Sequence, residues 1–209
     1  KAQQGYEERQ FHFDNLVTNG TFDTDTSGWT DSSIGTGTIA YDSGTMLLTS
    51  AGSSDLGITD QSMTTVVGKR YKLQVEITAT TGALNSFEVG TSQNGSQYGN
   101  TVNIGVGLHT FDFVATSTTL WFRFNGYFGV GTTNIDNVSV YEVDPNDSNK
   151  VIHTMPKGWK PLHVFEDGAL QREGSAYDYT VEYDGFNYVI KETVAPVAPY
   201  STTVIGVRA

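Results

Sequence analysis

The chain has 209 residues, and its 12 basic residues against 23 acidic ones give a net charge of −11. This charge disfavours nucleic-acid phosphates and anionic membranes, and no apolar run approaches the roughly 18 residues of a membrane span, so we expect neither nucleic acid nor membrane insertion. The chain has no cysteine, which excludes disulfides and thiolate metal sites and fits a protein that works outside the cell.

The class of fold follows from composition. Twenty-three glycines and abundant Thr and Ser favour strands joined by tight turns, while 37% hydrophobic residues suffice for a core. We therefore expect an all-β protein. The length favours two modules, one of about 130 residues and one smaller.

The ten residues before Phe11, KAQQGYEERQ, are polar and charged and contain no signal-peptide core. A leader has either been removed, or export does not use one. Residues 1–13 are predicted to be an arm that is unstructured in isolation or ordered only against a partner.

Residues 14–143 show the two-residue period of half-buried strands. Apolar residues alternate with polar ones from Tyr71 to Ile77, at Phe111 and Phe113, and from Leu120 to Phe124. Further short strands are expected at 39–41, 46–48, 87–89, 102–106 and 135–140. Because each strand has one apolar face, the module needs two facing sheets, and we expect a sandwich of about eight to ten strands.

Two segments at the ends of this module carry a family signature. NLVTNGTFDTDTSGW (15–29) and NIDNVSVYEV (134–143), with LWFRFNG (120–126), together resemble a carbohydrate-binding module of the family 4/9 type. The resemblance implies a jelly-roll β-sandwich over residues 14–143, whose first and last strands lie side by side. It implies attachment to glycans rather than catalysis.

The same resemblance implies a structural calcium ion. Asp23 and Asp136 match the carboxylates that hold it between the first and last strands, with the backbone carbonyl of Thr21 as a further ligand. Two carboxylates brought together without a cation would repel each other. The alternative is that Asp23 caps a turn and Asp136 is a solvated bulge residue. An EF-hand starting at Asp23 is rejected, because Ile34 stands at its twelfth position, where a bidentate Glu is required.

Sugar binding needs flat aromatic faces flanked by hydrogen-bonding groups. Trp121, Arg123 and Asn125 have the parity opposite to the apolar side chains of their strand, so they are predicted to point outward. Gln74 and Glu76 are predicted neighbours on the same sheet, and Tyr98, Tyr127 and Phe128 lie on Gly-rich segments expected to line one end of the sandwich. The alternative is that Trp121 packs under a loop or against another subunit. Trp29 is predicted to be a core residue.

The pattern changes at DPNDSNK (144–150), and residues 144–159 are predicted to be a linker. Residues 160–209 are predicted to form a small β module, with strands near 162–165, 169–171, 179–181, 188–190 and 202–207. This segment resembles a module of bacteriophage tail-fibre and other virion proteins. The matching residues are Val164, Phe165, Asp167, Gly168, Leu170, Gln171, Gly174, Asp178, Tyr179, Thr180, Val181, Asp184, Gly185, Ala195, Pro196, Val204, Ile205 and Gly206.

Catalysis is not expected. The four histidines show no metal-binding spacing, there is no nucleophile-elbow motif, and acidic pairs such as Glu182 with Asp184 fall at predicted turns.

The expected function is that of a non-enzymatic bacteriophage virion surface protein, a decoration, head-fibre or tail-fibre component whose jelly roll contacts host-surface or environmental glycans. Its expected partners are other virion proteins, glycans and further copies of itself, with threefold symmetry implied by the resemblance. Two alternatives stay open, a carbohydrate-binding module of a secreted polysaccharide-degrading enzyme and a structural virion subunit without sugar binding.

Overall fold

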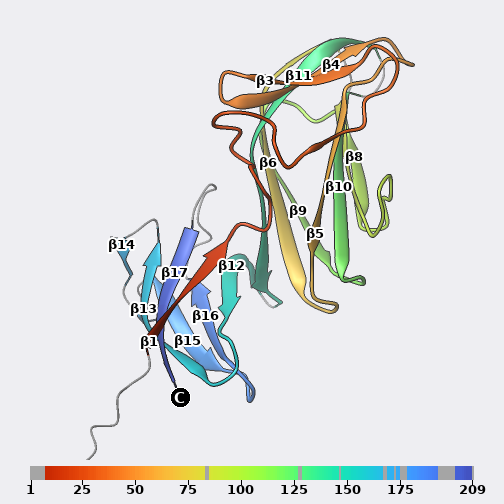
Figure 1. Ribbon diagram of the computed structural model, residues 1–209. Coiled ribbons are helices and arrows are strands. Elements are labelled where there is room, and N and C mark those ends of the chain that lie inside the picture. Colours follow the sequence, from red (N-terminus) through yellow and green to blue (C-terminus); the bar gives the residue numbers. More distant parts are fainter. Residues whose placement is uncertain are drawn as a thin grey trace, which may run out of the picture. The chain divides into compact units, whose positions relative to one another are not determined.

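A computed structural model describes residues 8–82, 85–126, 129–145, 147–166, 169–171, 173–174, 178–192 and 201–208. This part of the chain contains strands and no helix, which confirms the all-β class (Figure 1). The chain divides into two compact units. The first unit is 16–140, and the second combines 1–15 with 141–209. We call them the jelly-roll unit and the small unit.

The jelly-roll unit is a sandwich of two five-stranded sheets. The β10 sheet has the order β2-β5-β10-β7-β8, and the β6 sheet has the order β3-β4-β11-β6-β9. Strands of the β10 sheet are β2 (Thr30–Asp31), β5 (Ile58–Thr64), β7 (Asn85–Gly90), β8 (Gly99–Val102) and β10 (Thr119–Gly126). Those of the β6 sheet are β3 (Thr38–Asp42), β4 (Thr45–Ala51), β6 (Arg70–Thr81), β9 (Gly107–Val114) and β11 (Val130–Asp144).

The core lies between the two sheets and is built from the alternating apolar residues of the strands. Trp29 is buried there, as predicted, with its ring centroid 5.3 Å from those of Phe22 and Phe122. Its indole Nε1 donates a hydrogen bond to the carbonyl of Asn19 at 3.0 Å, which satisfies the one polar atom of the ring. Because inward and outward residues alternate, the polar residues of β10 must face away from this core.

The opening segment differs from the regular strand that was predicted. It does lie beside the last strand: the Leu16 N–H donates to the carbonyl of Val140, and the Val138 N–H donates to the carbonyl of Gly20. However, Asn19 and Phe22 have φ angles of 49° and 48°, which interrupt an extended ladder. The segment is therefore a looped ribbon held to β11 by separate hydrogen bonds.

The small unit has its own core of Met155, Trp159, Val164, Tyr179, Ile190 and Val204. One sheet has the order β1-β17-β13-β14, and β15, β16 and β12 pair in that order, with the residues of β11 beyond 140 pairing with β12. The strands are β1 (Glu8–Asp14), β12 (Asp147–Thr154), β13 (Trp159–Glu166), β14 (Ala169–Leu170), β15 (Tyr179–Tyr183), β16 (Tyr188–Glu192) and β17 (Ser201–Arg208).

Three sequence predictions about boundaries are wrong. Within the predicted N-terminal arm, the described residues from Glu8 onward are not a free tail, because Glu8–Asp14 pairs with β17 of the same chain. The predicted linker contains β12, which pairs with β16 despite its turn-rich sequence. The strand expected at 102–106 ends at Val102, where Asn103 has a φ of 56°.

Candidate functional site

The candidate site is the outward face of the β10 sheet. On this face Trp121 stands between Ser62 of β5 and Gly90 of β7, and Arg123 stands between Asp60 and Glu88 at the next level. The predicted parity of Trp121 and Arg123 is consistent with this register, because Leu120, Phe122 and Phe124 are buried in the core. Two neighbouring rows of polar and aromatic side chains therefore cross the sheet.

Arg123 is held rigidly by a carboxylate on the next strand. Its Nε lies 2.6 Å from Oδ1 of Asp60, and its Nη2 lies 3.0 Å from Oδ2. The Asp60 side chain is 1% exposed and that of Arg123 is 14% exposed. Such a bidentate pair fixes the plane of the guanidinium and leaves few rotamers to either side chain.

The loop between β7 and β8 covers the Arg123 end of this face. Nε2 of Gln93 lies 3.3 Å from Oδ2 of Asp60 and 3.3 Å from Oγ of Ser32, so the loop reaches across β10. A Cβ at Gly90 would lie 2.4 Å from the backbone of Gly95, which places the loop directly above that glycine. The loop therefore forms a wall beside Trp121.

The Trp121 end of the face stays open. Trp121 is half-buried, whereas its β5 neighbour Ser62 is exposed, as is Thr64 two residues further along. Glu88 is half-buried on the adjacent strand. The result is an indole at the foot of a loop wall, with a hydroxyl and a carboxylate nearby. This combination of a flat apolar face and fixed polar groups suits a sugar ring.

The other predicted sugar-binding residues do not join Trp121. Asn125 is buried and its Nδ2 donates to Oγ of Ser86 at 3.2 Å, so its amide is occupied. Gln74 and Glu76 are not on the same sheet as Trp121, because β6 belongs to the opposite sheet. Their hydrogen-bonding partners are Ser139 and Asn137 of β11.

The predicted aromatic residues of the loops are not gathered at the site either. Tyr98 packs against the core, with its ring centroid 4.9 Å from that of Phe113, and its hydroxyl accepts the backbone N–H of Thr116. Tyr127 and Phe128 lie outside the described residues. Trp121 is thus the one aromatic residue of the prediction that the described structure places on this face.

The predicted calcium ligands come from the looped opening segment and from β11. The pKa of Asp136 is raised above its ordinary value, first by burial and then by the negative charges of Glu76 and Asp23. Oδ1 of Asp136 accepts the backbone N–H of Asn137 at 2.7 Å, and Oδ2 of Asp23 accepts the hydroxyl of Thr21 at 2.9 Å. The negative charge of Asp23 therefore acts on the carboxyl group of Asp136, and a bound cation would offset this repulsion.

The donor set for such an ion is small. In the described part of the chain, no three side chains of His, Cys, Asp or Glu converge as metal ligands. A Ca²⁺ ion prefers six to eight oxygens, so here it would depend on backbone carbonyls, such as that of Thr21, and on water. A calcium ion held by Asp23 and Asp136 therefore stays a prediction.

Sequence reasoning missed Asp60, Glu88 and Gln93. The strand β5, ITDQSMT, is polar at most positions and was not recognised, although Asp60 in it is almost fully buried. Arg123 and Gln93 satisfy Asp60, whereas the buried side chains of Thr59 and Gln61 bond backbone groups of the preceding segment. The sequence shows an aspartate and an arginine, but it does not show that they lie on neighbouring strands. Only the pairing of β5 with β10 brings Asp60 and Arg123 together.

The fold and the face define the class of protein as an all-β chain with a jelly-roll sandwich, one sheet face of which carries a half-exposed tryptophan. No protein-family model and no curated protein sequence matches the chain. In the described part, no helix is long and apolar enough to cross a membrane.

Several solved structures are similar to part of the chain. The enzymatically active domain of tailspike protein 4 of bacteriophage CBA120 is 21% identical with a TM-score of 0.48, over 62% of this chain and 21% of that one. The structure of BiXyn10A CBM1 is 19% identical with a TM-score of 0.47, over 62% of this chain and 95% of that one. The N-terminal cellulose-binding domain of Cellulomonas fimi β-1,4-glucanase C is 19% identical with a TM-score of 0.44, over 61% and 97%. The chain thus spans about a fifth of the tailspike domain.

Proposed function

We propose that the chain is a non-enzymatic glycan-binding protein and that the open end of the outward β10 sheet face is its binding surface. The observation that carries this proposal is the half-exposed indole of Trp121 at the foot of the β7–β8 loop wall. A pyranose stacks its apolar face on such a ring while Ser62 and Glu88 hydrogen-bond its hydroxyls. The Arg123–Asp60 ion pair lies next to Trp121 on the same face and holds the two strands that carry the surface together.

The proposal extends to a place on a bacteriophage particle. The support is the sequence of the small unit, whose pattern from Val164 to Gly206 resembles a module of virion proteins. In this role the small unit or the jelly-roll unit attaches to other virion proteins, and copies of the chain associate with threefold symmetry. The location is the virion surface, as a decoration, head-fibre or tail-fibre component. An antibody against the chain should then label purified particles rather than the free secreted fraction.

The absence of catalysis is part of the proposal. The acidic pair considered for glycoside hydrolysis is engaged in structural contacts: Glu182 pairs with Lys191 at 2.8 Å, and Asp184 accepts backbone N–H groups of its own turn. On the candidate face, Asp60 is neutralised by Arg123. Carboxylates held in this way supply neither a free acid nor a nucleophile.

A structural calcium ion between the opening segment and β11 completes the proposal. Asp23 and Asp136 would supply carboxylate oxygens and Thr21 its carbonyl. The ion would join the opening and closing segments of the jelly-roll unit, which otherwise are held by separate backbone hydrogen bonds. Its role would be structural, since the site lies on β11, away from the β10 sheet.

A glycan array tests the main proposal. The wild-type chain should bind a subset of glycans, and Trp121→Ala should lose that signal without a large change in thermal stability. The matched control is Tyr41→Ala, which removes an exposed aromatic residue from the other sheet. A wild-type chain that binds no glycan, or a signal that survives Trp121→Ala, would refute the glycan surface and leave the structural virion subunit.

A further inference from the structure

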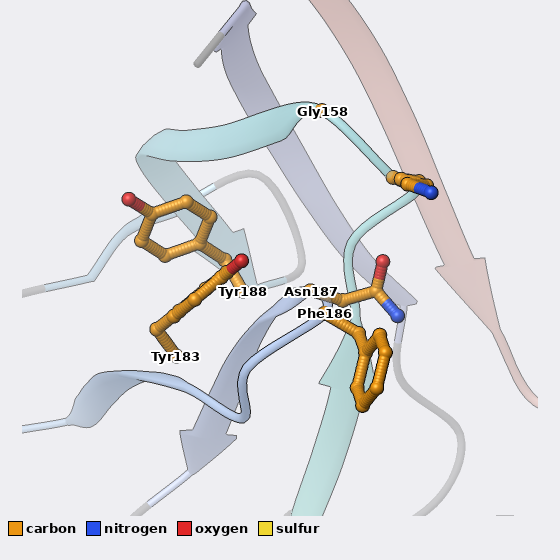
Figure 2. A pocket seen from close by; sticks show the side chains of 6 residues that line it. Gly158, Tyr183, Phe186, Asn187 and Tyr188 are labelled. Carbon is orange, nitrogen blue, oxygen red and sulfur yellow. The ribbon is translucent and has the colours of Figure 1, made fainter.

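The small unit contains a cavity of about 330 Å³ that the function proposed above does not use. It is lined by Lys157, Gly158, Tyr183, Phe186, Asn187 and Tyr188 and is called here the hairpin pocket. Figure 2 shows the rings of Tyr183 and Tyr188 beside each other, with Phe186 and Asn187 on the same hairpin and the turn at Gly158 across from them. The pocket therefore lies between the β15–β16 hairpin and the turn that precedes β13.

The hairpin tip is ordered by its own hydrogen bonds. Oδ1 of Asp184 accepts the backbone N–H groups of Phe186 at 2.8 Å and of Asn187 at 2.7 Å. Gly185 has a φ of 96°, which suits glycine in a tight turn, and its carbonyl accepts the Tyr183 hydroxyl at 3.2 Å. The aromatic side chains are therefore presented on a preformed turn, so a ligand does not have to order them.

The facing turn is equally well defined. The Trp159 N–H donates to the carbonyl of Pro156 at 3.0 Å, and Gly158 has a φ of 82°. Trp159 itself is buried in the core of the small unit, which anchors the turn. Both walls of the hairpin pocket thus rest on ordered structure.

The pocket exposes large aromatic surface. Phe186 is 76% exposed and Tyr183 is 61% exposed, although Tyr179 and Ile190 of the same hairpin are buried in the core of the small unit. The rings of Tyr183 and Tyr188 have centroids 5.1 Å apart and planes tilted by 48°. Exposed aromatic residues gathered around a cavity are typical of binding sites rather than of ordinary surface.

The charged residue among those that line the pocket is basic. Lys157 lines it, and Nζ of Lys160 lies 6.0 Å from the ring centroid of Tyr188. Within the described residues no salt bridge engages either ammonium group. Of the hairpin's carboxylates, that of Glu182 pairs with Lys191, and that of Asp184 is bound to two backbone N–H groups of the tip and keeps its negative charge. In a chain of net charge −11, two lysines at one pocket favour an anionic ligand there.

We propose that the hairpin pocket binds an acidic sugar, a pyranose ring that carries a carboxylate. The apolar face of the ring packs on Phe186 and the tyrosines, the amide of Asn187 bonds ring hydroxyls, and Lys157 and Lys160 attract the carboxylate. A cavity of about 330 Å³ is at the lower end of the roughly 300–1,000 Å³ of small-molecule sites, which suits one or two sugar rings. The pocket is separate from the β10 sheet face, so the small unit contributes a second recognition site.

Isothermal titration of the full chain with matched probes tests this site. The acidic probes are trigalacturonate, a uronic acid, and 6′-sialyllactose, a nonulosonic acid, and their neutral counterparts are galactotriose and lactose. At least one acidic probe should bind, more tightly than its neutral counterpart by about tenfold or more. Phe186→Ala and the double variant Lys157→Ala/Lys160→Ala should each weaken this binding by about tenfold. Leu170→Ala, an exposed apolar residue on β14, and Trp121→Ala should leave it unchanged.

Four outcomes would overturn the hairpin pocket. In the first, neither acidic probe binds. In the second, binding survives both Phe186→Ala and the double lysine variant. In the third, Phe186→Ala changes the oligomeric state in light scattering and leaves sugar binding intact. In this third case the aromatic patch is a contact between copies of the chain. If Trp121→Ala alone abolishes acidic-sugar binding, the ligand belongs to the β10 sheet face, so the pocket is refuted and the glycan surface is supported.

Discussion

Arg123 and Asp60 form a bidentate ion pair between neighbouring strands of the β10 sheet, with Nε–Oδ1 and Nη2–Oδ2 distances of 2.6 and 3.0 Å. The pair lies beneath Gln93, which adds a hydrogen bond to the same carboxylate. It therefore joins three elements, β5, β10 and the β7–β8 loop, beside the half-exposed Trp121. Its contribution to stability can be compared with that of an exposed ion pair on the other sheet.

Asp60→Ala should destabilise the jelly-roll unit by about 3–5 kcal/mol, because it leaves a mostly buried guanidinium without its counter-charge. The matched control is Asp112→Ala, which breaks the exposed Arg70–Asp112 pair of the other sheet and should cost at most about 1 kcal/mol. Urea unfolding followed by tryptophan fluorescence measures both. Equal losses for the two variants would contradict a structural role for the Asp60 carboxylate.

Gly20→Ala should destabilise the same unit through a steric clash. A Cβ at Gly20 would lie 2.0 Å from the carbonyl oxygen of Val138, and that oxygen is backbone, so the opening segment has to move. A loss of about 1–3 kcal/mol is expected in thermal or urea unfolding. Gly105→Ala serves as control, since a Cβ there meets nothing within 4 Å. An unchanged Gly20→Ala variant would show that the opening segment does not depend on this approach.

The pH dependence of stability should reveal the crowding at Asp136. Its pKa is raised in the folded protein by burial and then by Glu76 and Asp23, so the folded state holds this proton more tightly than the unfolded state does. The resulting stabilisation is present at low pH and is lost as the pH rises above about 4. Asp136→Asn retains an acceptor for the Asn137 N–H and should lack that loss.

The comparison is made in a metal chelator, with unfolding free energies of the wild type and Asp136→Asn measured from pH 3 to pH 7. The variant should gain stability relative to the wild type as the pH rises. Parallel curves for the two proteins would mean that the carboxyl group is not perturbed in the folded state.

Calcium should reverse the sign of this effect if the proposed ion binds. Adding Ca²⁺ should raise the melting temperature of the wild type, a chelator should lower it, and Asp136→Ala should abolish the difference because it removes a carboxylate ligand. Differential scanning fluorimetry with Ca²⁺ and with Mg²⁺ as a control measures it. A wild-type melting temperature that changes with neither Ca²⁺ nor the chelator would refute the calcium site.

Strands with clear alternation could be predicted from the sequence. The apolar residues from Tyr71 to Ile77 and from Leu120 to Phe124 indicate buried faces directly, and the structure confirms the sheets that they form. The outward direction of Trp121 follows from the same parity. Alternation indicates a strand and its faces, but it does not say which strands are neighbours.

The sequence could not show which strands are neighbours, because strands that lie far apart in the chain pair with each other. Asp60 and Arg123 are 63 positions apart, and a polar strand such as β5 reads as a loop until its partners are known. Gln74 and Glu76 were placed beside Trp121 for the same reason, since parity alone does not assign a strand to a sheet. The pairing of β1 with β17 is a contact between residues nearly 200 positions apart, beyond the reach of any local pattern.

The hydrogen bond from Leu16 to Val140 has a consequence for how the chain is assembled. These residues are the first and last of the jelly-roll unit, and they are adjacent in space. The jelly roll is thus inserted between β1 and the remainder of the small unit, and its two ends leave side by side. A domain whose two ends are adjacent can be exchanged for another domain without separating the strands that flank it. Recombination could replace it with another sandwich without disturbing the β1–β17 pairing of its host.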